Sequence, residues 1–161
     1  MTTMTLDVFT RYCDRLDEMA QLFLRRLHQE IIVNLGNKIT DKITGHQFMM
    51  MKIIGDRGRA TVSNVADDLN VSLSAVTAQV DRLCKTGMVA RSRSEKDRRV
   101  VWLTLTNAGQ EVVDVCEDVR LRVMQRYLGH LDERDLLHII SIYEKIIALM
   151  RQEEECAIKP K

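Results

Sequence analysis

Two short amphipathic helices separated by a three-residue turn are expected at the centre of the chain, and this feature limits the possible folds more than any other. Apolar residues at helical spacing indicate one helix after Thr61 and another from Ser74 to Lys85. Asn70-Val71-Ser72 between them has the composition of a tight turn. The inward positions are expected to be Val62, Val65, Ala66 and Leu69, then Ala75, Val76, Val80 and Leu83. Two helices joined in this way form a helix-turn-helix.

A β-hairpin is predicted directly after the second helix. Gly87 suits the position that ends this helix, because glycine adopts the left-handed conformation without strain. The segments 88–92 and 100–105 have the composition of strands, and the turn 94–99 between them is charged. A hairpin in this place would be the wing of a winged helix-turn-helix.

A long helix and a capped shorter helix are predicted before this centre. Apolar residues recur every three or four positions from about Leu6 to Leu35, and Gly36 with the polar stretch after it closes the pattern. Thr44 is expected to cap the next helix, with Gln47 completing a capping box. The buried side of that helix is expected to contain Phe48, Met49, Met51, Ile53 and Ile54.

Two more helices are predicted towards the C-terminus. Thr106 can cap a helix from Asn107 to about Leu128, and Asp132 can cap a last one. The inner residues of the last helix are expected to be Leu136, Ile139, Ile140, Tyr143, Ile146, Ile147 and Met150, and the charged tail after Arg151 is expected to fray.

Length and composition agree with one mostly helical domain. The chain has 161 residues, 45% of them hydrophobic, with 7 Gly and 1 Pro, which favours long uninterrupted helices over a many-turned β fold. We therefore expect a mostly α fold with a small β-wing. Residues 1–161 would form a single domain, with a winged helix-turn-helix at about 44–106 flanked by long dimerisation helices at about 5–36 and 107–153.

Several chemistries are not expected. Cys13, Cys84, Cys116 and Cys156 form no CxxC pair or zinc-finger cadence, and no signal peptide precedes them, so we expect reduced cytoplasmic thiols. No apolar run approaches the roughly 20 residues that cross a bilayer. The four histidines show no metal-ligand spacing, so we expect no metal site and no cofactor. No phosphate loop, nucleophile elbow or HExxH motif is present, which argues against an enzyme.

Positive charge gathers around the predicted hairpin. Residues 81–99 contain seven basic and three acidic residues, a net charge of +4 in a chain whose total is +1. Such segregation is typical of a face that meets a polyanion.

Four motifs together resemble the MarR family of bacterial winged-helix regulators. They are the run Val76–Leu83, Lys85-Thr86-Gly87-Met88-Val89 after it, the wing Asp97-Arg98-Arg99, and Leu103-Thr104-Leu105-Thr106-Asn107-Ala108-Gly109. The resemblance covers essentially the whole chain. It implies a homodimer that binds a pseudo-palindromic operator in double-stranded DNA, most often as a repressor released by a small molecule or an oxidant.

The second helix of the helix-turn-helix supplies the first set of candidate DNA contacts. Ser72, Ser74 and Thr77 present hydroxyl groups at its N-terminal end, where they can reach base edges or phosphates in a major groove. Gln79 can contact adenine, and Arg82 can reach a phosphate. The alternative for the serines is simple capping of the helix.

The hairpin tip supplies the second set. Arg98 and Arg99 can place a guanidinium in a narrow minor groove. The resemblance makes Arg99 the groove-reading arginine and Asp97 the carboxylate that orients it. The alternative is a solvated turn with a weak ion pair.

Dimerisation and sensing are expected in the flanking helices. The apolar stripes of the first and last helices exceed what a winged helix can cover, which predicts pairing with a second copy. The alternative is that both stripes cover the core of a single chain. The resemblance places an effector where the helical region meets the winged helix, with candidate lining residues Tyr12, Phe23, His46, Met49 and Met50. The alternative is that these side chains belong to the core, as a stripe of methionine and aromatic residues more often does.

Cys13 resembles in position the reactive cysteine of hydroperoxide-sensing members of the family. Activation would need a lowered thiol pKa, for which Tyr12 and Arg15 are the local candidates. A plain packing thiol is the alternative. For the protein as a whole, the alternative function is a winged-helix protein-interaction module, which salt dependence separates from a DNA-binding protein.

Overall fold

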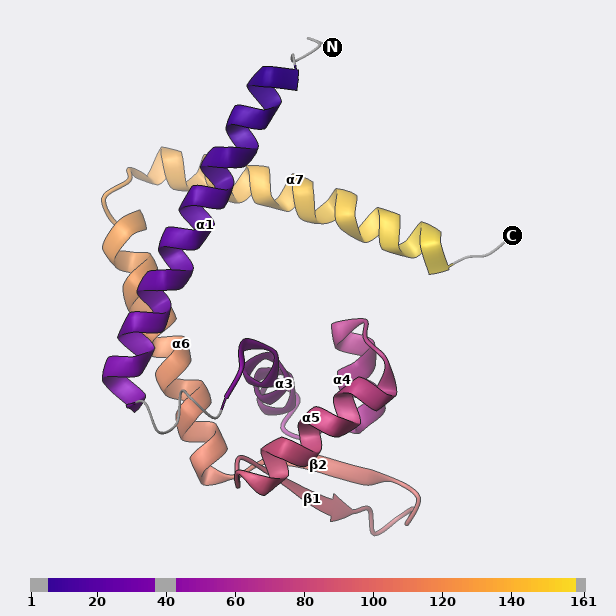
Figure 1. Ribbon diagram of the computed structural model, residues 1–161. Helices are drawn as coiled ribbons and strands as arrows, with labels where there is room; N and C mark the ends of the chain where they lie inside the picture. Colours follow the sequence, from indigo (N-terminus) through magenta and orange to yellow (C-terminus); the bar gives the residue numbers. More distant parts are fainter. Residues whose placement is uncertain (1–5, 37–42, 159–161) are drawn as a thin grey trace. The chain divides into compact units, whose positions relative to one another are not determined.

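The computed structural model describes residues 6–36 and 43–158. The chain divides into two compact units, Met1–Arg120 and Leu121–Lys161. The first unit contains the helix-turn-helix and the wing (Figure 1). No helix among the described residues is both long enough and apolar enough to cross a membrane.

Helix α1 (Leu6–Leu35) runs for thirty residues, as its periodicity predicted. None of its residues is fully buried in the single chain. Ile31 and Leu35 near its C-terminal end pack against the core, whereas Phe9, Tyr12 and other large apolar residues of its N-terminal half are exposed. The polar stretch predicted to follow the helix, residues 37–42, lies outside the described residues.

Helices α3 (Gly45–Asp56) and α4 (Val62–Leu69) both begin with a complete capping box. Thr44 and Gln47 form the first box, as the sequence predicted, and Thr61 and Asn64 form the second. Asn70 ends α4 in the left-handed conformation, with φ of 51°. Asparagine tolerates this conformation better than most residues, so the chain can turn sharply here.

Helix α5 (Leu73–Lys85) is the second helix of the helix-turn-helix, and it starts one residue earlier than predicted because Ser72 is its N-cap. Val76, Val80 and Leu83 are buried, but Ala75 is exposed, contrary to expectation. The buried residues follow one i, i+4, i+7 row, and Ala75 lies off this row.

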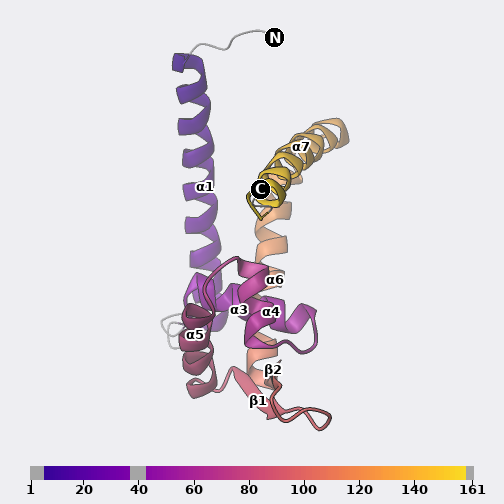
Figure 2. The same cartoon turned by 90° about the vertical axis from the view of Figure 1, so that its right-hand side faces the viewer.

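Strands β1 (Val89–Arg93) and β2 (Val101–Leu105) form the wing, an antiparallel hairpin in which Val89 pairs with Leu105 and Arg93 with Val101. Ala60 adds a short bridge to Leu103 of β2, with hydrogen bonds of 3.0 and 2.7 Å. The hairpin loop projects from the lower end of the unit in both ribbon views (Figures 1 and 2).

The wing is joined tightly to helix α6 (Asn107–Leu128). The Thr106 hydroxyl donates to the Gly87 carbonyl at 2.6 Å and accepts the Gly109 N–H at 3.0 Å. Gly109 passes so close to Met88, the residue before strand β1, that a Cβ there would lie 2.1 Å from the Met88 carbonyl oxygen. Thr106 and Gly109 therefore fasten the start of α6 to the residues that lead into β1.

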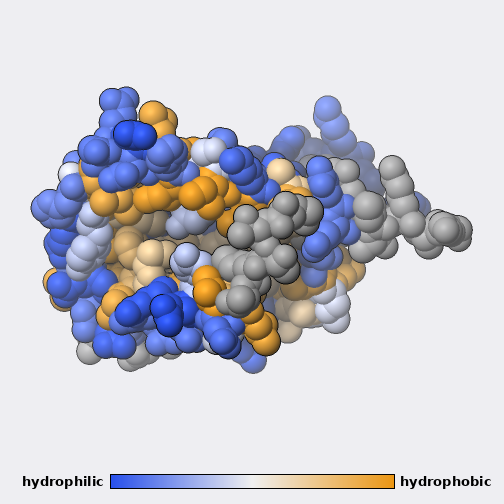
Figure 3. Space-filling view, turned by 90° about the horizontal axis from the view of Figure 1, so that it is seen from above, coloured by the Kyte–Doolittle hydropathy of each residue, from blue (hydrophilic) through white to orange (hydrophobic). Residues whose placement is uncertain are grey.

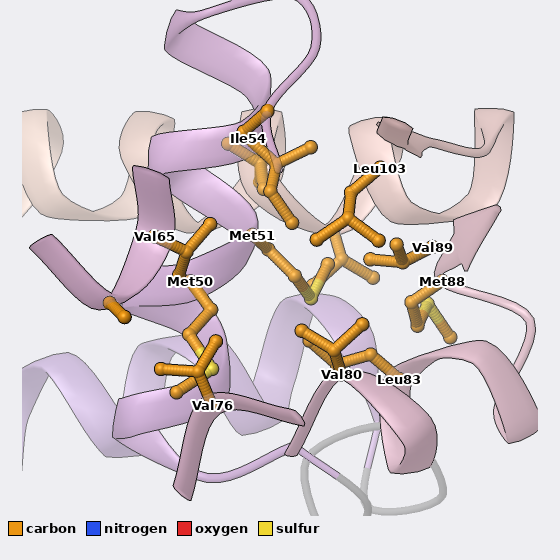
Figure 4. Packing of buried hydrophobic residues seen from close by; sticks show 14 of the residues in the cluster. Met50, Met51, Ile54, Val65, Val76, Val80, Leu83, Met88, Val89 and Leu103 are labelled. Atoms are coloured by element: carbon orange, nitrogen blue, oxygen red, sulfur yellow. The ribbon is translucent and has the colours of Figure 1, made fainter. Parts of the chain in front are cut away.

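The core of the first unit lies between α3, α4, α5 and the wing. Met51, Ile54, Leu83 and Leu103 are fully buried and point towards one another (Figure 4). Met50 is only 4% exposed, whereas Met49 is 46% exposed, so the prediction that Met49 faces the core is wrong. The core row of α3 runs through Gln47, Met50, Met51 and Ile54, which places Met49 on another side of the helix.

The second unit contains the end of α6 and helix α7 (Glu133–Ile158). Asp132 caps α7, since its Oδ1 atom accepts the N–H of Asp135 at 2.8 Å. The backbone remains helical past Arg151 to Ile158, so the frayed tail expected there is not observed at these residues. Much of the apolar surface of α7 is exposed in the single chain, at Leu137, Ile140, Ile142, Tyr143, Ile146, Ile147, Leu149 and Met150. Figure 3 shows hydrophobic side chains forming bands on one face of the molecular surface.

Candidate nucleic-acid interface

The N-terminal end of α5 presents three exposed hydroxyl groups. Ser72 Oγ accepts the N–H of Ala75 at 3.3 Å and lies 3.2 Å from Ser74 Oγ, and Thr77 Oγ1 donates to the Leu73 carbonyl at 2.8 Å. Capping by Ser72 is therefore real. The hydroxyl groups can still form further hydrogen bonds, because each has one donor site and two acceptor sites.

Gln79 and Arg82 lie further along α5. The Gln79 Oε1 atom accepts a hydrogen bond from Gln47 Nε2 of α3 at 3.0 Å. Asp81 forms an ion pair with Arg91 of β1 at 2.7 Å. Arg82 is exposed and has no carboxylate partner among the described residues, so its charge is available to a phosphate.

The wing tip carries two further unpaired cations. Arg98 and Arg99 are exposed and form no ion pair within the described part of the chain. Asp97 Oδ1 accepts the backbone N–H of Arg99 at 2.9 Å, and Ser94 Oγ accepts the N–H groups of Lys96 and Asp97. Asp97 thus shapes the turn through the backbone of Arg99, and no contact with the Arg99 guanidinium is seen in the single chain.

Arg59 adds a basic group that sequence reasoning missed. Its guanidinium lies 4.6 Å from the ring centroid of Trp102 in β2, within cation–π range. Its charge remains exposed beside the wing. No sequence pattern indicated this pairing, since it depends on the bridge that brings Ala60 against Leu103.

Comparisons with known proteins place this arrangement in a family. The MarR family profile matches residues 43–101. The HTH-type transcriptional repressor MdtR of Bacillus subtilis is 31% identical over 147 residues, which span 91% of this chain and 95% of that repressor. The chain belongs to the MarR family.

Solved structures have the same fold as this MarR-family protein. FabT of Streptococcus pneumoniae, solved in complex with DNA, is 25% identical with a TM-score of 0.69, covering 91% of this chain and 99% of FabT. A MarR family protein from Bacillus stearothermophilus is 24% identical with a TM-score of 0.67, covering 95% and 99% of the two chains. The winged helix-turn-helix predicted from the sequence is thereby confirmed.

The first unit of this MarR-family protein also holds a cavity of about 700 Å³ where α1, α3 and the first half of α6 meet. Most of its wall is apolar, formed by Leu24, Leu27, Ile31, Leu35, Ile43, Phe48, Met49 and Val112. His28, Thr44 and Arg120 are the main polar residues of the wall. Arg120 donates a hydrogen bond to Glu117, which also pairs with Lys52 at 3.4 Å. The pKa of the Glu117 carboxyl is lowered, mainly by the hydrogen bond from Arg120 and also by the charge of Lys52.

The residues predicted to sense an effector lie in different surroundings. Met49 lines the cavity, but Met50 belongs to the core because it shares the buried row of α3. Tyr12 and His46 are exposed, Phe23 is half-buried, and none of the three lines this cavity. The sequence did not distinguish the α1 residues that line the cavity from the rest of the apolar stripe of that helix.

The described cysteines are free thiols. Cys13 is half-buried on α1, and Arg15, its local cation, pairs with Glu18 at 2.6 Å. Cys116 lies in the cavity wall, where burial raises the pKa of its thiol to about 11. Among the described residues, no group of three potential metal ligands comes together.

Proposed function

We propose that this protein is a dimeric regulator of transcription that binds a pseudo-palindromic operator in double-stranded DNA and acts as a repressor in the cytoplasm, without a catalytic role. The observation that carries the proposal is a set of exposed cations on the two elements of the winged helix that can reach DNA, Arg82, Arg98 and Arg99, none of which pairs with a carboxylate of the described residues. The relationship to a transcriptional repressor and to a protein solved with DNA supports it.

The recognition helix in this proposal is α5. The hydroxyl groups of Ser72, Ser74 and Thr77 stand at its N-terminal end, where a helix can enter the major groove with bare N–H groups and a positive dipole. Gln79 would contact a base, and Arg82 a phosphate. Phosphate contacts set the position of the protein, and base contacts set its sequence preference.

The wing would read the adjacent minor groove. Arg99 is the inserted cation and Arg98 lies beside it, while Asp97 holds the turn through the Arg99 backbone N–H. Arginine is favoured there because a narrow minor groove concentrates negative potential.

The helices on either side would form the dimer. Residues 1–161 act as one domain in this proposal, with residues 44–106 on DNA and residues 5–36 and 107–153 pairing two copies. Apolar residues exposed on α1 and on α7 support it, because a large exposed apolar patch on a helix face marks an interaction site. Two copies related by a twofold axis would present two recognition helices to two half-sites.

Release from DNA is proposed to follow binding of an apolar small molecule in the cavity. The wall joins α1 to the N-terminal end of α3, so a ligand there can change how the helical region holds the winged helix. The cavity favours a small molecule over an oxidant acting on Cys13, whose neighbouring cation is already paired.

Fluorescence anisotropy with labelled DNA from upstream of the protein's own gene tests the proposal. Binding should be selective over unrelated DNA and should fall steeply as salt rises, because phosphate neutralisation releases counterions. A protein-interaction module would show neither property. Candidate apolar ligands added to the complex then test release.

A further inference from the structure

Gln47 is the one buried residue with a polar side chain in the described part of the chain, with 4% of its surface exposed. It is the third residue of α3, and all of its side-chain polar atoms are used. Gln47 Oε1 accepts the backbone N–H of Thr44 at 2.9 Å, and Gln47 Nε2 donates to Gln79 Oε1 at 3.0 Å. A buried amide therefore connects the cap of α3 to the recognition helix.

The hydrogen bonds from Thr44 to Gln47 and from Gln47 to Gln79 form a relay, and its direction is determined by the Thr44 backbone N–H. A backbone N–H can only donate, so the Gln47 atom that faces Thr44 must be the oxygen. The other end of the Gln47 amide is then the NH₂ group, which must find an acceptor, and the atom of Gln79 that faces it must be Oε1. The Gln79 oxygen is therefore bound to α3, and its Nε2 group remains as a hydrogen-bond donor.

Gln79 stands in line with residues on the exposed side of the recognition helix. Ser72, Ala75, Gln79 and Arg82 follow one another at steps of three and four, which places them along one row of α5. Ser72, Ala75 and Arg82 are exposed, and Gln79 is half-buried, with its inner edge held by Gln47. Its outer edge therefore faces the same side as the other members of the row.

We propose that Gln47 is a positioning residue that makes Gln79 a hydrogen-bond donor towards DNA, so that α5 selects a base with a major-groove acceptor at one operator position. The inference rests on the proposed function. Guanine offers the acceptors N7 and O6, whereas cytosine offers only the N4 donor. An unrestrained glutamine would instead pair with adenine through both ends of its amide, which requires Oε1 as well.

The substitution Gln47→Glu tests the relay because it keeps the cap and reverses the far end. One carboxylate oxygen can still accept the Thr44 N–H, but the other cannot donate to Gln79. The Gln79 amide should then turn, donate Nε2 to the carboxylate and present Oε1 outward. The affinity for guanine relative to cytosine at its position should then fall.

The experiment is selection of binding sites from a random double-stranded DNA library by the wild-type protein, followed by affinities for the four bases at each position at pH 8. The Gln79 position is the one whose preference disappears in Gln79→Ala. There we expect the ratio of affinities for guanine and cytosine to fall in Gln47→Glu by on the order of tenfold or more, the scale of one good base contact. Preferences at other positions should stay.

Asn64→Asp is the matched control. Asn64 is the third residue of α4 and its Oδ1 accepts the Thr61 N–H at 3.0 Å, so the same amide-to-acid change is made in a second capping box. No contact of Asn64 with Gln79 is observed. This variant should keep the wild-type guanine-to-cytosine ratio, which separates the relay from a general effect of a new carboxylate.

Gln47→Met covers the case in which Gln47→Glu does not fold, as judged by circular dichroism. Methionine has a similar shape but its side chain has no hydrogen-bond donor, so the Gln79 amide should turn freely. The ratio of affinities for guanine and cytosine should then fall towards one. An unchanged ratio in whichever folded variant is measured overturns the inference, while selective binding by the wild-type protein leaves the proposed function standing. Absence of any sequence-selective binding by the wild-type protein would refute both.

Discussion

Replacement of Gly109 by alanine puts two physical effects in opposition. Gly109 lies in the first turn of α6, where alanine is ordinarily the better helix former by about 1 kcal/mol. The added Cβ, however, would lie 2.1 Å from the Met88 carbonyl oxygen and 3.0 Å from the Met88 carbonyl carbon. These are backbone atoms, so the contact cannot be relieved by rotation of a side chain.

The change in the free energy of unfolding depends on which backbone atoms must move to make room for the Cβ. The same Met88 carbonyl accepts the Thr106 N–H at 3.0 Å, and moving Met88 away from the start of α6 would stretch this bond. Overpacking costs about 1–3 kcal/mol, and the hydrogen bond contributes about 1 kcal/mol. After the gain in helix propensity, we expect Gly109→Ala to lower the free energy of unfolding by about 1–3 kcal/mol.

Urea denaturation followed by circular dichroism at a fixed protein concentration measures this change, since stability of a dimer depends on concentration. Gly45→Ala is the control, because Gly45 also lies in the first turn of a helix and a Cβ there would meet nothing within 4 Å. This control should be neutral or slightly stabilising. If Gly109→Ala is equally neutral or raises the midpoint, the close approach of α6 to the Met88 backbone does not limit stability.

Four further outcomes are expected. Arg99→Ala should weaken operator binding by about 1–3 kcal/mol without changing the oligomeric state, and equal affinity at matched salt would exclude the wing from DNA binding. Ending the chain after Leu131 should leave a monomeric or aggregating species with much weaker operator binding, and sedimentation of a stable, binding-competent dimer would contradict the role given to α7. Because Arg15 is held by Glu18, peroxide should affect DNA binding by the wild-type protein and Cys13→Ser alike, and retention of DNA by the variant alone would make Cys13 the sensor. Because burial raises its pKa to about 11, the Cys116 thiol is protonated at pH 8 and should react slowly with iodoacetamide, which mass spectrometry of the native protein can measure.

Local chemistry determined much of this fold. The Thr44 and Gln47 capping box, the turn at Asn70 and the break at Gly87 all depend on neighbours a few residues away, so they could be predicted from residue type and spacing. The exposed residues of the DNA-binding face were predictable for the same reason, because hydroxyls at a helix start and arginines in a hairpin turn are local patterns. The DNA contacts assigned to them remain predictions.

Contacts between distant parts of the chain were decided only by tertiary packing. The hydrogen bond from Gln47 to Gln79, the stacking of Arg59 on Trp102 and the apolar wall of the cavity each join elements far apart in sequence. The α3 pattern likewise did not tell that Met50 faces the core and Met49 the cavity, since consecutive methionines offer the same hydrophobicity to either side. Periodicity gives the direction of an apolar stripe within one helix, but the partner of each side chain depends on how the helices pack, and that information is spread over the whole chain.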